Sequence, residues 1–338
     1  MAIAASIQPE FYSVFSPDKI EEIVHYLDTE KEIPFKFFYQ GNMVKEWEEF
    51  NEAQEKARLS SAKTDDKFLK NVCIHLFQAE SDCDRWNIVD IGAANPLLVK
   101  KLVGTFLDSD ILNSYIALDI SQGILDLSHS QLTEWFPNLN WQGHLWDFEK
   151  EIIPTIVAEK RQARTSEQIN NLYLYIGGTF CNVKDRINVL KNIAERMLPS
   201  EWLCVSFGVD FIGAKNKEFE VETHISAAAC RYVIELLGID PNDVQIVGYF
   251  DEKWGGYKTD ILFQQDYCFE FKLKNSQKIV QFNQGDRINI YRFFSYAIES
   301  DTSCPAIFED FQKAGLEIIS YRIEALLSRV MIVCQLIT

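Results

Sequence analysis

The stretch Trp86–Pro96, WNIVDIGAANP, decides the fold class of this 338-residue chain. Its first letters are apolar enough for a buried strand, and the strand pattern ends at Gly92. The apolar, helix-periodic segment VKKLVGTFL (99–107) follows almost directly. A short strand, a glycine turn and a helix in that order are typical of the opening unit of a parallel α/β sheet.

The same pattern recurs downstream in four further apolar stretches: SYIALDIS (114–121), NLNWQGHLWDF (138–148), NLYLYIGGTFCN (171–182) and WLCVSFGVD (202–210). Helical patterns such as GILDLSHSQLTEWF (123–136) and VKDRINVLKNIAERML (183–198) lie between them. Strands that alternate with helices predict a doubly wound, mostly parallel sheet covered on both faces. Such sheets bind ligands at the carboxyl ends of their strands.

The flanking regions read differently. Near the N-terminus, Ser16 and Pro17 open a helix with an apolar stripe. In residues 211–296 strands no longer alternate with helices, and the pattern indicates a helix followed by antiparallel strands. Residues 305–336 indicate a helix that ends at Gly315 and a strand pair that returns to the first sheet. We therefore divide the chain into an N-terminal part of a second domain (1–67), the sheet domain (68–210), an inserted part of the second domain (211–296) and a C-terminal helix and strand pair (297–338), which completes the sheet.

Composition excludes several classes of partner. The chain carries 33 Lys and Arg against 50 Asp and Glu, a formal net charge of −17, which argues against nucleic acid and anionic membrane surfaces. No apolar run approaches the ~20 residues of a membrane helix, and the N-terminus shows no signal pattern, so we expect a cytoplasmic protein. The five histidines and eight cysteines show no metal-ligand spacing, which predicts no metal site and reduced thiols.

Residues with chemical potential follow the predicted strands in a fixed order. A glycine at the first turn lets backbone amides approach a ligand closely. An acid that ends the second strand can accept both hydroxyls of a ribose. An acid and a ring after the third strand suit the amino group and face of an adenine. The cofactor-binding residues predicted on this basis are Asp90, Gly92, Ala93, Asp119, Ile120, Asp147, Phe148 and Gly177.

The glycine turn also discriminates between cofactors. DIGAANP lacks the third glycine of the dinucleotide motif G-x-G-x-x-G, and Pro96 has no amide for a pyrophosphate. A cofactor without phosphates fits better, and S-adenosylmethionine has an adenosine, an amino-acid tail and a positive sulfonium that suits an acidic protein. A nicotinamide oxidoreductase is the alternative for the same sheet. The remaining alternative is that these residues are only sheet-terminal turns with solvated acids.

At these residues the sequence resembles the class I methyltransferases, and more narrowly the histidine-specific methyltransferase family of the ergothioneine pathway. PFKFFYQGN (34–42), LYLYIGGTFCN (172–182) and WLCVSFGVDFIGAKN (202–216) are similar to segments of that family, and FEFKLKNSQKIVQFNQGDRI (269–288) resembles its late β-region. The resemblance implies a Rossmann-like class I methyltransferase sheet with an antiparallel last strand. It also implies a split α+β substrate-binding domain, built from the N-terminal segment and the insertion after the fifth strand.

The resemblance carries roles to individual residues. Gly92 matches the cofactor glycine, Asp119 the ribose acid, and Asp147 and Phe148 the adenine contacts. Tyr39 matches a substrate-pocket tyrosine and Asn182 an asparagine that holds the amino-acid group of the substrate; both are our candidates for orienting the acceptor in catalysis. The predicted substrate-binding residues are Tyr39, Phe180, Asn182, Asp210, Tyr291 and Phe293.

Two departures from the family pattern concern the acceptor. The Tyr-Tyr-Pro-Thr-Arg segment of the family is replaced here by NEAQEKARLSS (51–61), and its Glu-x-Ser pair, which holds the imidazole, falls on Tyr291 and Phe293. A binding site that lacks the polar side chains that recognise a substrate loses much of its preference for that substrate. We therefore expect a small-molecule acceptor other than histidine, N-methylated on an amino acid, amine or secondary metabolite, by a monomer or homodimer. O-methylation of a natural product and a non-catalytic cofactor-binding subunit are the alternatives.

Overall fold

The computed structural model describes residues 2–41, 43–56, 68–69, 84–94, 96–161, 168–211, 225–298, 304–324 and 328–338. The chain divides into two compact units, each assembled from two segments. Unit 1 comprises Met1–Phe50 and Asn216–Phe294, and unit 2 comprises Asn51–Lys215 and Ser295–Thr338. The sequence placed the transitions after residues 67, 210 and 296, and those boundaries stay predictions.

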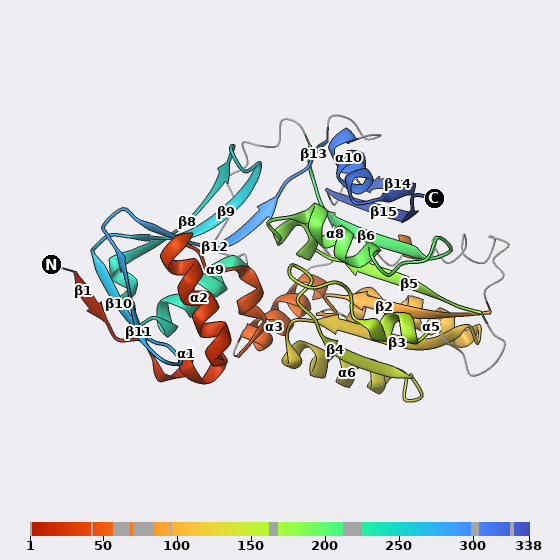
Figure 1. Ribbon diagram of the computed structural model, residues 1–338, viewed down its shortest axis with the longest axis horizontal. Helices are drawn as coiled ribbons and strands as arrows, with labels where there is room; N and C mark the ends of the chain where they lie inside the picture. Colours follow the sequence, from red (N-terminus) through yellow and green to blue (C-terminus); the bar gives the residue numbers. More distant parts are fainter. Residues whose placement is uncertain are drawn as a thin grey trace. The chain divides into compact units, whose positions relative to one another are not determined.

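Unit 2 is built on a seven-stranded sheet in the order β14-β15-β6-β5-β2-β3-β4 (Figure 1). The strands β2 to β6 are parallel, and β15 runs antiparallel to both of its neighbours. The predicted doubly wound sheet with an antiparallel last strand is therefore confirmed. The strands are β2 (Arg85–Ile91), β3 (Leu112–Asp119), β4 (Trp141–Leu145), β5 (Ile169–Ile176), β6 (Trp202–Gly208), β14 (Leu316–Glu324) and β15 (Arg329–Leu336).

The strand order fixes where a ligand can bind. From β2 the chain proceeds outward through β3 to β4 and then returns to β5 on the other side of β2. The order thus reverses between β2 and β5, and open α/β sheets bind ligands outside the carboxyl ends of strands at such a reversal. The interiors of β2, β3 and β5 are buried on both faces, as a parallel sheet between helices requires.

Helices and single turns connect these strands. Ser121 caps α6, its hydroxyl accepting the amide of Ile124 at 3.4 Å, and Asp185 caps α8 in the same way at 2.9 Å. Gly315, at φ +80°, ends α10 as the sequence predicts. The elements are η2 (Pro96–Leu98), α5 (Lys100–Asp108), α6 (Gln122–Trp135), α7 (Thr155–Glu159), η3 (Thr179–Asn182), α8 (Arg186–Ala194) and α10 (Pro305–Lys313).

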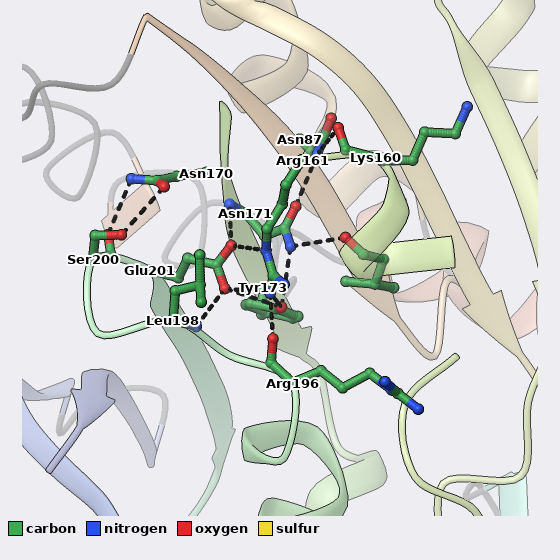
Figure 2. Close-up of polar contacts among 11 residues, drawn as sticks. Asn87, Lys160, Arg161, Asn170, Asn171, Tyr173, Arg196, Leu198, Ser200 and Glu201 are labelled. Carbon is green, nitrogen blue, oxygen red and sulfur yellow. Dashed lines mark hydrogen bonds and ion pairs between the residues drawn. The ribbon is translucent and has the colours of Figure 1, made fainter. Parts of the chain in front are cut away.

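A buried polar network joins the amino ends of the parallel strands (Figure 2). The Glu201 carboxylate is fully buried and accepts from both Nε and Nη2 of Arg161, at 2.6 and 2.7 Å. It also accepts the Tyr173 hydroxyl at 3.2 Å and the Asn171 amide at 2.9 Å. The side-chain amide of Asn171 in turn accepts from Asn87 at 2.8 Å. Charge and hydrogen-bonding capacity are therefore matched within the protein at this edge.

Unit 1 contains two three-stranded sheets, β1-β10-β11 and β12-β9-β8. Its strands are β1 (Ile3–Ala5), β8 (Val244–Asp251), β9 (Gly256–Phe263), β10 (Tyr267–Lys272), β11 (Gln277–Phe282) and β12 (Arg287–Phe294). Its helices are α1 (Pro9–Val14), α2 (Pro17–Thr29), η1 (Phe35–Tyr39), α3 (Met43–Lys56), which continues past the unit boundary, α9 (Ile225–Leu236) and η5 (Pro241–Asp243). The helix predicted at Ser16-Pro17 is confirmed as α2, and the Ser16 hydroxyl caps it by accepting the amide of Lys19 at 3.4 Å. No helix in the described part of the chain is long and apolar enough to cross a membrane.

A short parallel pair forms where the chain leaves unit 2 and where it returns. Strand β7 (Asp210–Phe211) pairs with β13 (Ala297–Ile298), with Ala297 opposite Asp210. The Asp210 amide donates to the carbonyl of Tyr296 at 3.0 Å. The two chain crossings are therefore held side by side within unit 2.

Candidate functional site

The turn after β2 has the conformation that the sequence predicts. Gly92 lies at φ +71°, a region that other residues rarely adopt. Its amide donates to the Leu118 carbonyl at 2.8 Å, which fixes the end of β2 to β3. A Cβ at Gly92 would lie 3.7 Å from Oγ1 of Thr179, so η3 after β5 borders the same turn. Ala93 is buried in the apolar core, and Asn95 lies outside the described residues.

Asp90 is a buried acid one residue before the end of β2. Its Oδ2 accepts the hydroxyl of Tyr115, which lies on β3. Burial raises the pKa of Asp90 to about 6, and the hydrogen bond from Tyr115 opposes that rise. Oδ1 of Asp90 accepts no hydrogen bond from the part of the chain that the structure describes, so it is available to a ligand.

Asp119 is a second buried acid and ends β3. Its Oδ1 accepts the amide of Ser121 at 2.9 Å. Burial raises the pKa of Asp119 to about 7; the charge of Asp90 adds to the rise, and the backbone amides of Ser121 and Ile120 oppose it. No described lysine or arginine forms an ion pair with either acid. Two desolvated carboxyl groups, neither with a counter-ion among the described residues, therefore share one edge of the sheet.

Asp147 and Phe148 follow β4 at the same edge. The amide of Trp146, just before them, donates to the Asp119 carbonyl at 2.8 Å. Oδ1 of Asp147 accepts the Glu149 amide at 3.2 Å. The Phe148 ring packs against Trp146 and Tyr175, with centroids 5.9 and 5.8 Å apart. Their contacts with an adenine stay predictions.

The segment after β5 combines an open turn with a buried acceptor. Gly177 has φ +121°, and its amide donates to the Ser206 hydroxyl at 3.3 Å. Phe180 is 1% exposed, and its ring lies 4.8 Å from that of Phe207 in the core of unit 2. This anchors η3 and leaves Asn182 at its end, where Oδ1 is buried without a hydrogen-bond partner among the described residues.

The predicted substrate residues of unit 1 form an aromatic cluster. Tyr39, on η1, stacks on Trp47 of α3, with centroids 5.1 Å apart and planes at 20°. Tyr291, on β12, meets Phe35 edge-on at 4.9 Å, and Phe35 lies 5.8 Å from Tyr39. Phe293 is two residues further along β12 and is packed against the same core. We call Phe35, Tyr39, Trp47 and Tyr291 the ring cluster.

The structure thus groups the predicted residues by unit. The carboxyl edge of β2 to β5 carries all of the predicted cofactor residues together with Asn182, whereas the ring cluster belongs to unit 1. Asp210 is engaged at the β7–β13 pair, where its Oδ2 accepts the Ser295 hydroxyl at 2.6 Å. Sequence reasoning missed Tyr115, although a tyrosine in the aliphatic strand SYIALD signals a buried hydroxyl that needs an acceptor.

The polar atoms at the carboxyl edge favour one kind of ligand. The Asp90 and Asp119 carboxylates and Oδ1 of Asn182 are all hydrogen-bond acceptors, and Oδ1 of Asn182 has no partner among the described residues. Such an edge suits a ligand that brings hydroxyls and a positive charge rather than phosphates. The ribose hydroxyls, ammonium and sulfonium of S-adenosylmethionine meet that requirement, so the residues present fit this cofactor.

Comparison with solved structures finds methyltransferases at low identity. A S-adenosylmethionine-dependent methyltransferase from Clostridium acetobutylicum is 11% identical, with 86% of this chain and 98% of that chain covered, at a TM-score of 0.48. The CcbJ methyltransferase from Streptomyces caelestis is 11% identical over 75% and 84% of the two chains, at 0.38. The glycopeptide N-methyltransferase MtfA, in complex with S-adenosylmethionine, is 11% identical over 78% and 92%, also at 0.38.

Comparison with curated protein sequences finds no significant match. A family model does match, described as histidine-specific methyltransferase, S-adenosylmethionine-dependent, and it spans residues 20–300. That span includes the glycine turn, both buried acids and the ring cluster. The chain therefore belongs to the family of S-adenosylmethionine-dependent, histidine-specific methyltransferases.

Proposed function

We propose that this chain methylates a nitrogen of an amino acid, an amine or a small secondary metabolite, and that the acceptor is not histidine. The observation that carries the proposal is the placement of Tyr291. Its ring is 5% exposed and is held against Phe35 in the ring cluster, at the position where the family pattern has the glutamate that reads an imidazole. An aromatic ring offers neither the negative charge nor the carboxylate acceptor needed to recognise an imidazole.

The charges next to this position are already neutralised. Arg292 lies between Tyr291 and Phe293, and its guanidinium is ion-paired with the buried Glu32. The ring cluster therefore offers an acceptor mainly aromatic faces and edges. Such surroundings favour an apolar or aromatic acceptor over a small polar one, and they attract a methylated ammonium product through the faces of the rings.

The chain contributes orientation and desolvation to the reaction. When bound, S-adenosylmethionine supplies a methyl group activated by a sulfonium. Because methyl transfer is an in-line displacement, holding the nucleophile in position provides much of the acceleration. We assign that task to Tyr39 and to Asn182, whose buried Oδ1 is an acceptor for an N–H of the acceptor amine. Apolar surroundings favour the neutral, nucleophilic form of an amine.

The distribution of histidines favours nitrogen over oxygen as the nucleophile. A hydroxyl acceptor requires a general base to remove its proton. The described histidines are His25 on α2, His129 on α6 and His144 on β4. Within the described residues none lies in the turns directly after β2, β3 and β5, on η1 or on β12. An amine that arrives neutral needs no such base.

A methyl-transfer assay with labelled cofactor and a panel of amino acids and amines tests the proposal. We expect the wild type to prefer apolar or aromatic amines, and the double variant Tyr291→Glu, Phe293→Ser to gain measurable activity on histidine. Ile279→Glu, at a position 56% exposed on β11, is the control for adding a carboxylate to unit 1. Efficient methylation of free histidine by the wild type would overturn the acceptor proposal. Cofactor binding without any S-adenosylhomocysteine release would support a non-catalytic subunit instead.

A further inference from the structure

Tyr115 is a buried tyrosine in the middle of β3 that has no role in the function described so far. Its side chain is 0% exposed. In the β2–β3 register Tyr115 lies opposite Ile88, two residues before Asp90 on the same face of β2. The ring therefore runs along the sheet toward its carboxyl edge, where the hydroxyl donates to Oδ2 of Asp90.

The surroundings of Asp90 make this hydrogen bond important. Among the described residues, the titratable groups that face Asp90 are Tyr115, through the hydrogen bond, and Asp119, through its charge. The Tyr115 hydroxyl is the one donor to the Asp90 carboxyl group among the described residues. A buried carboxylate without a cation depends on such a donor both for its ionisation and for its orientation.

We propose that Tyr115 is a positioning residue for cofactor binding. Its hydroxyl holds Asp90 as an oriented carboxylate and leaves Oδ1 available to a hydrogen-bond donor of the bound S-adenosylmethionine. The inference rests on the proposed cofactor role of Asp90 and adds a residue that acts only through that acid. Loss of the hydroxyl removes the interaction that lowers the pKa of Asp90, while burial, which raises it, remains.

The test is the pH dependence of cofactor affinity in Tyr115→Phe, measured by calorimetry with S-adenosylhomocysteine from pH 5.5 to 9. A hydrogen bond to a charged group corresponds to an upward shift of about 1–2 pH units in the Asp90 inflection. Because an acid with a higher pKa is protonated at higher pH, the variant should bind about tenfold more weakly than wild type near pH 6. At pH 9, where Asp90 is ionised in both proteins, only the loss of orientation remains, so the difference in affinity should be smaller than near pH 6.

Tyr173→Phe is the matched control, because Tyr173 also has a buried, hydrogen-bonded hydroxyl in the same sheet but lies in the network at the opposite edge (Figure 2). Its pH profile should stay that of the wild type. A second readout needs no ligand: the carboxyl resonance of Asp90 in ¹³C-labelled protein, assigned by its loss in Asp90→Asn, should titrate at higher pH in Tyr115→Phe.

The outcomes separate the inference from the function on which it rests. An affinity lowered equally at every pH would show that Tyr115 only packs, and wild-type affinity of Asp90→Asn at every pH would remove Asp90 from the site; either result overturns the inference alone. A wild type that binds neither S-adenosylmethionine nor S-adenosylhomocysteine would contradict the proposed function itself.

Discussion

The two edges of the unit 2 sheet treat buried charge in opposite ways. At the amino edge, the Glu201 carboxylate is surrounded by donors from Arg161, Tyr173 and the backbone (Figure 2). At the carboxyl edge, Asp90 and Asp119 are also buried, each 5% exposed, but have no cation among the described residues. Burial of an unpaired carboxyl group costs stability. Among the described residues the protein itself completes the amino edge, and the unpaired acids of the carboxyl edge support the proposed cofactor site there.

Removing the charge at the completed edge should have the largest effect on stability. In Glu201→Gln, Arg161 keeps its charge in a partly buried position and loses its counter-ion. Breaking such a pair typically costs about 3–5 kcal/mol. We expect this loss in the free energy of unfolding, measured by urea denaturation, with cofactor affinity in the folded fraction within about twofold of wild type. A large loss of affinity would show that the two edges are coupled.

Neutralising an acid at the carboxyl edge should change cofactor affinity strongly and should not cost stability. Asp119→Asn removes a charge-assisted acceptor, each such hydrogen bond being worth roughly 1.5–3 kcal/mol, so cofactor affinity should fall at least about tenfold. Calorimetry with S-adenosylmethionine measures it. Unchanged affinity in a folded variant would remove Asp119 from the cofactor site.

The same variant should be more stable than wild type without ligand at high pH. The pKa of Asp119 is raised from 3.8 to about 7 in the folded protein, so between these values the folded state binds more protons than the unfolded state. The stability contributed by the protonated group is present below pH 4 and is lost as pH rises through about 7. The gain of Asp119→Asn over wild type should therefore grow across this window to at most about 4 kcal/mol. A difference independent of pH would contradict this reading.

The smallest effect is expected at Ser121, which lies at the carboxyl edge but has both its hydroxyl and its amide hydrogen-bonded within the protein. Its hydroxyl caps α6, while its backbone amide holds Asp119. Ser121→Ala should lose about 1 kcal/mol of stability, as is usual for a helix cap. Cofactor affinity should stay within about twofold, since alanine retains the amide. A larger loss of affinity would assign the hydroxyl itself to the ligand.

The parts of the fold that the sequence predicts are those coded by adjacent residues. Ser16 and Pro17 predict the start of α2, and Gly315 predicts the end of α10. Each of the five parallel strands ends near a Gly or Asp. Pairings between distant segments lack such a signal. The parallel pairing of β1 with β10, in which Ile3 lies opposite Tyr267, depends on a segment far away in the chain.

The candidate site divides along the same line. Gly92 and Asp119 are visible as turn and strand-end residues, because the backbone there has a local requirement. Phe180 is one of the predicted substrate residues; its ring packs into the core, and its contact with a substrate stays a prediction. The network around Glu201 was not predicted, since neither Arg161 nor Glu201 carries a sequence pattern that distinguishes it from a surface charge.

The β7–β13 pair has a consequence for how this architecture can diversify. Because Asp210 and Ala297 lie opposite one another, the long stretch between them leaves and rejoins unit 2 at almost one point. Insertions whose ends lie close together can be lengthened, exchanged or rebuilt with little disturbance to the host fold. Most of the strands of unit 1, β12 with Tyr291 and Phe293 among them, belong to that stretch. Under the proposed function, replacement of this one contiguous segment would change Tyr291 and Phe293 together, while the carboxyl edge of the unit 2 sheet stays as it is.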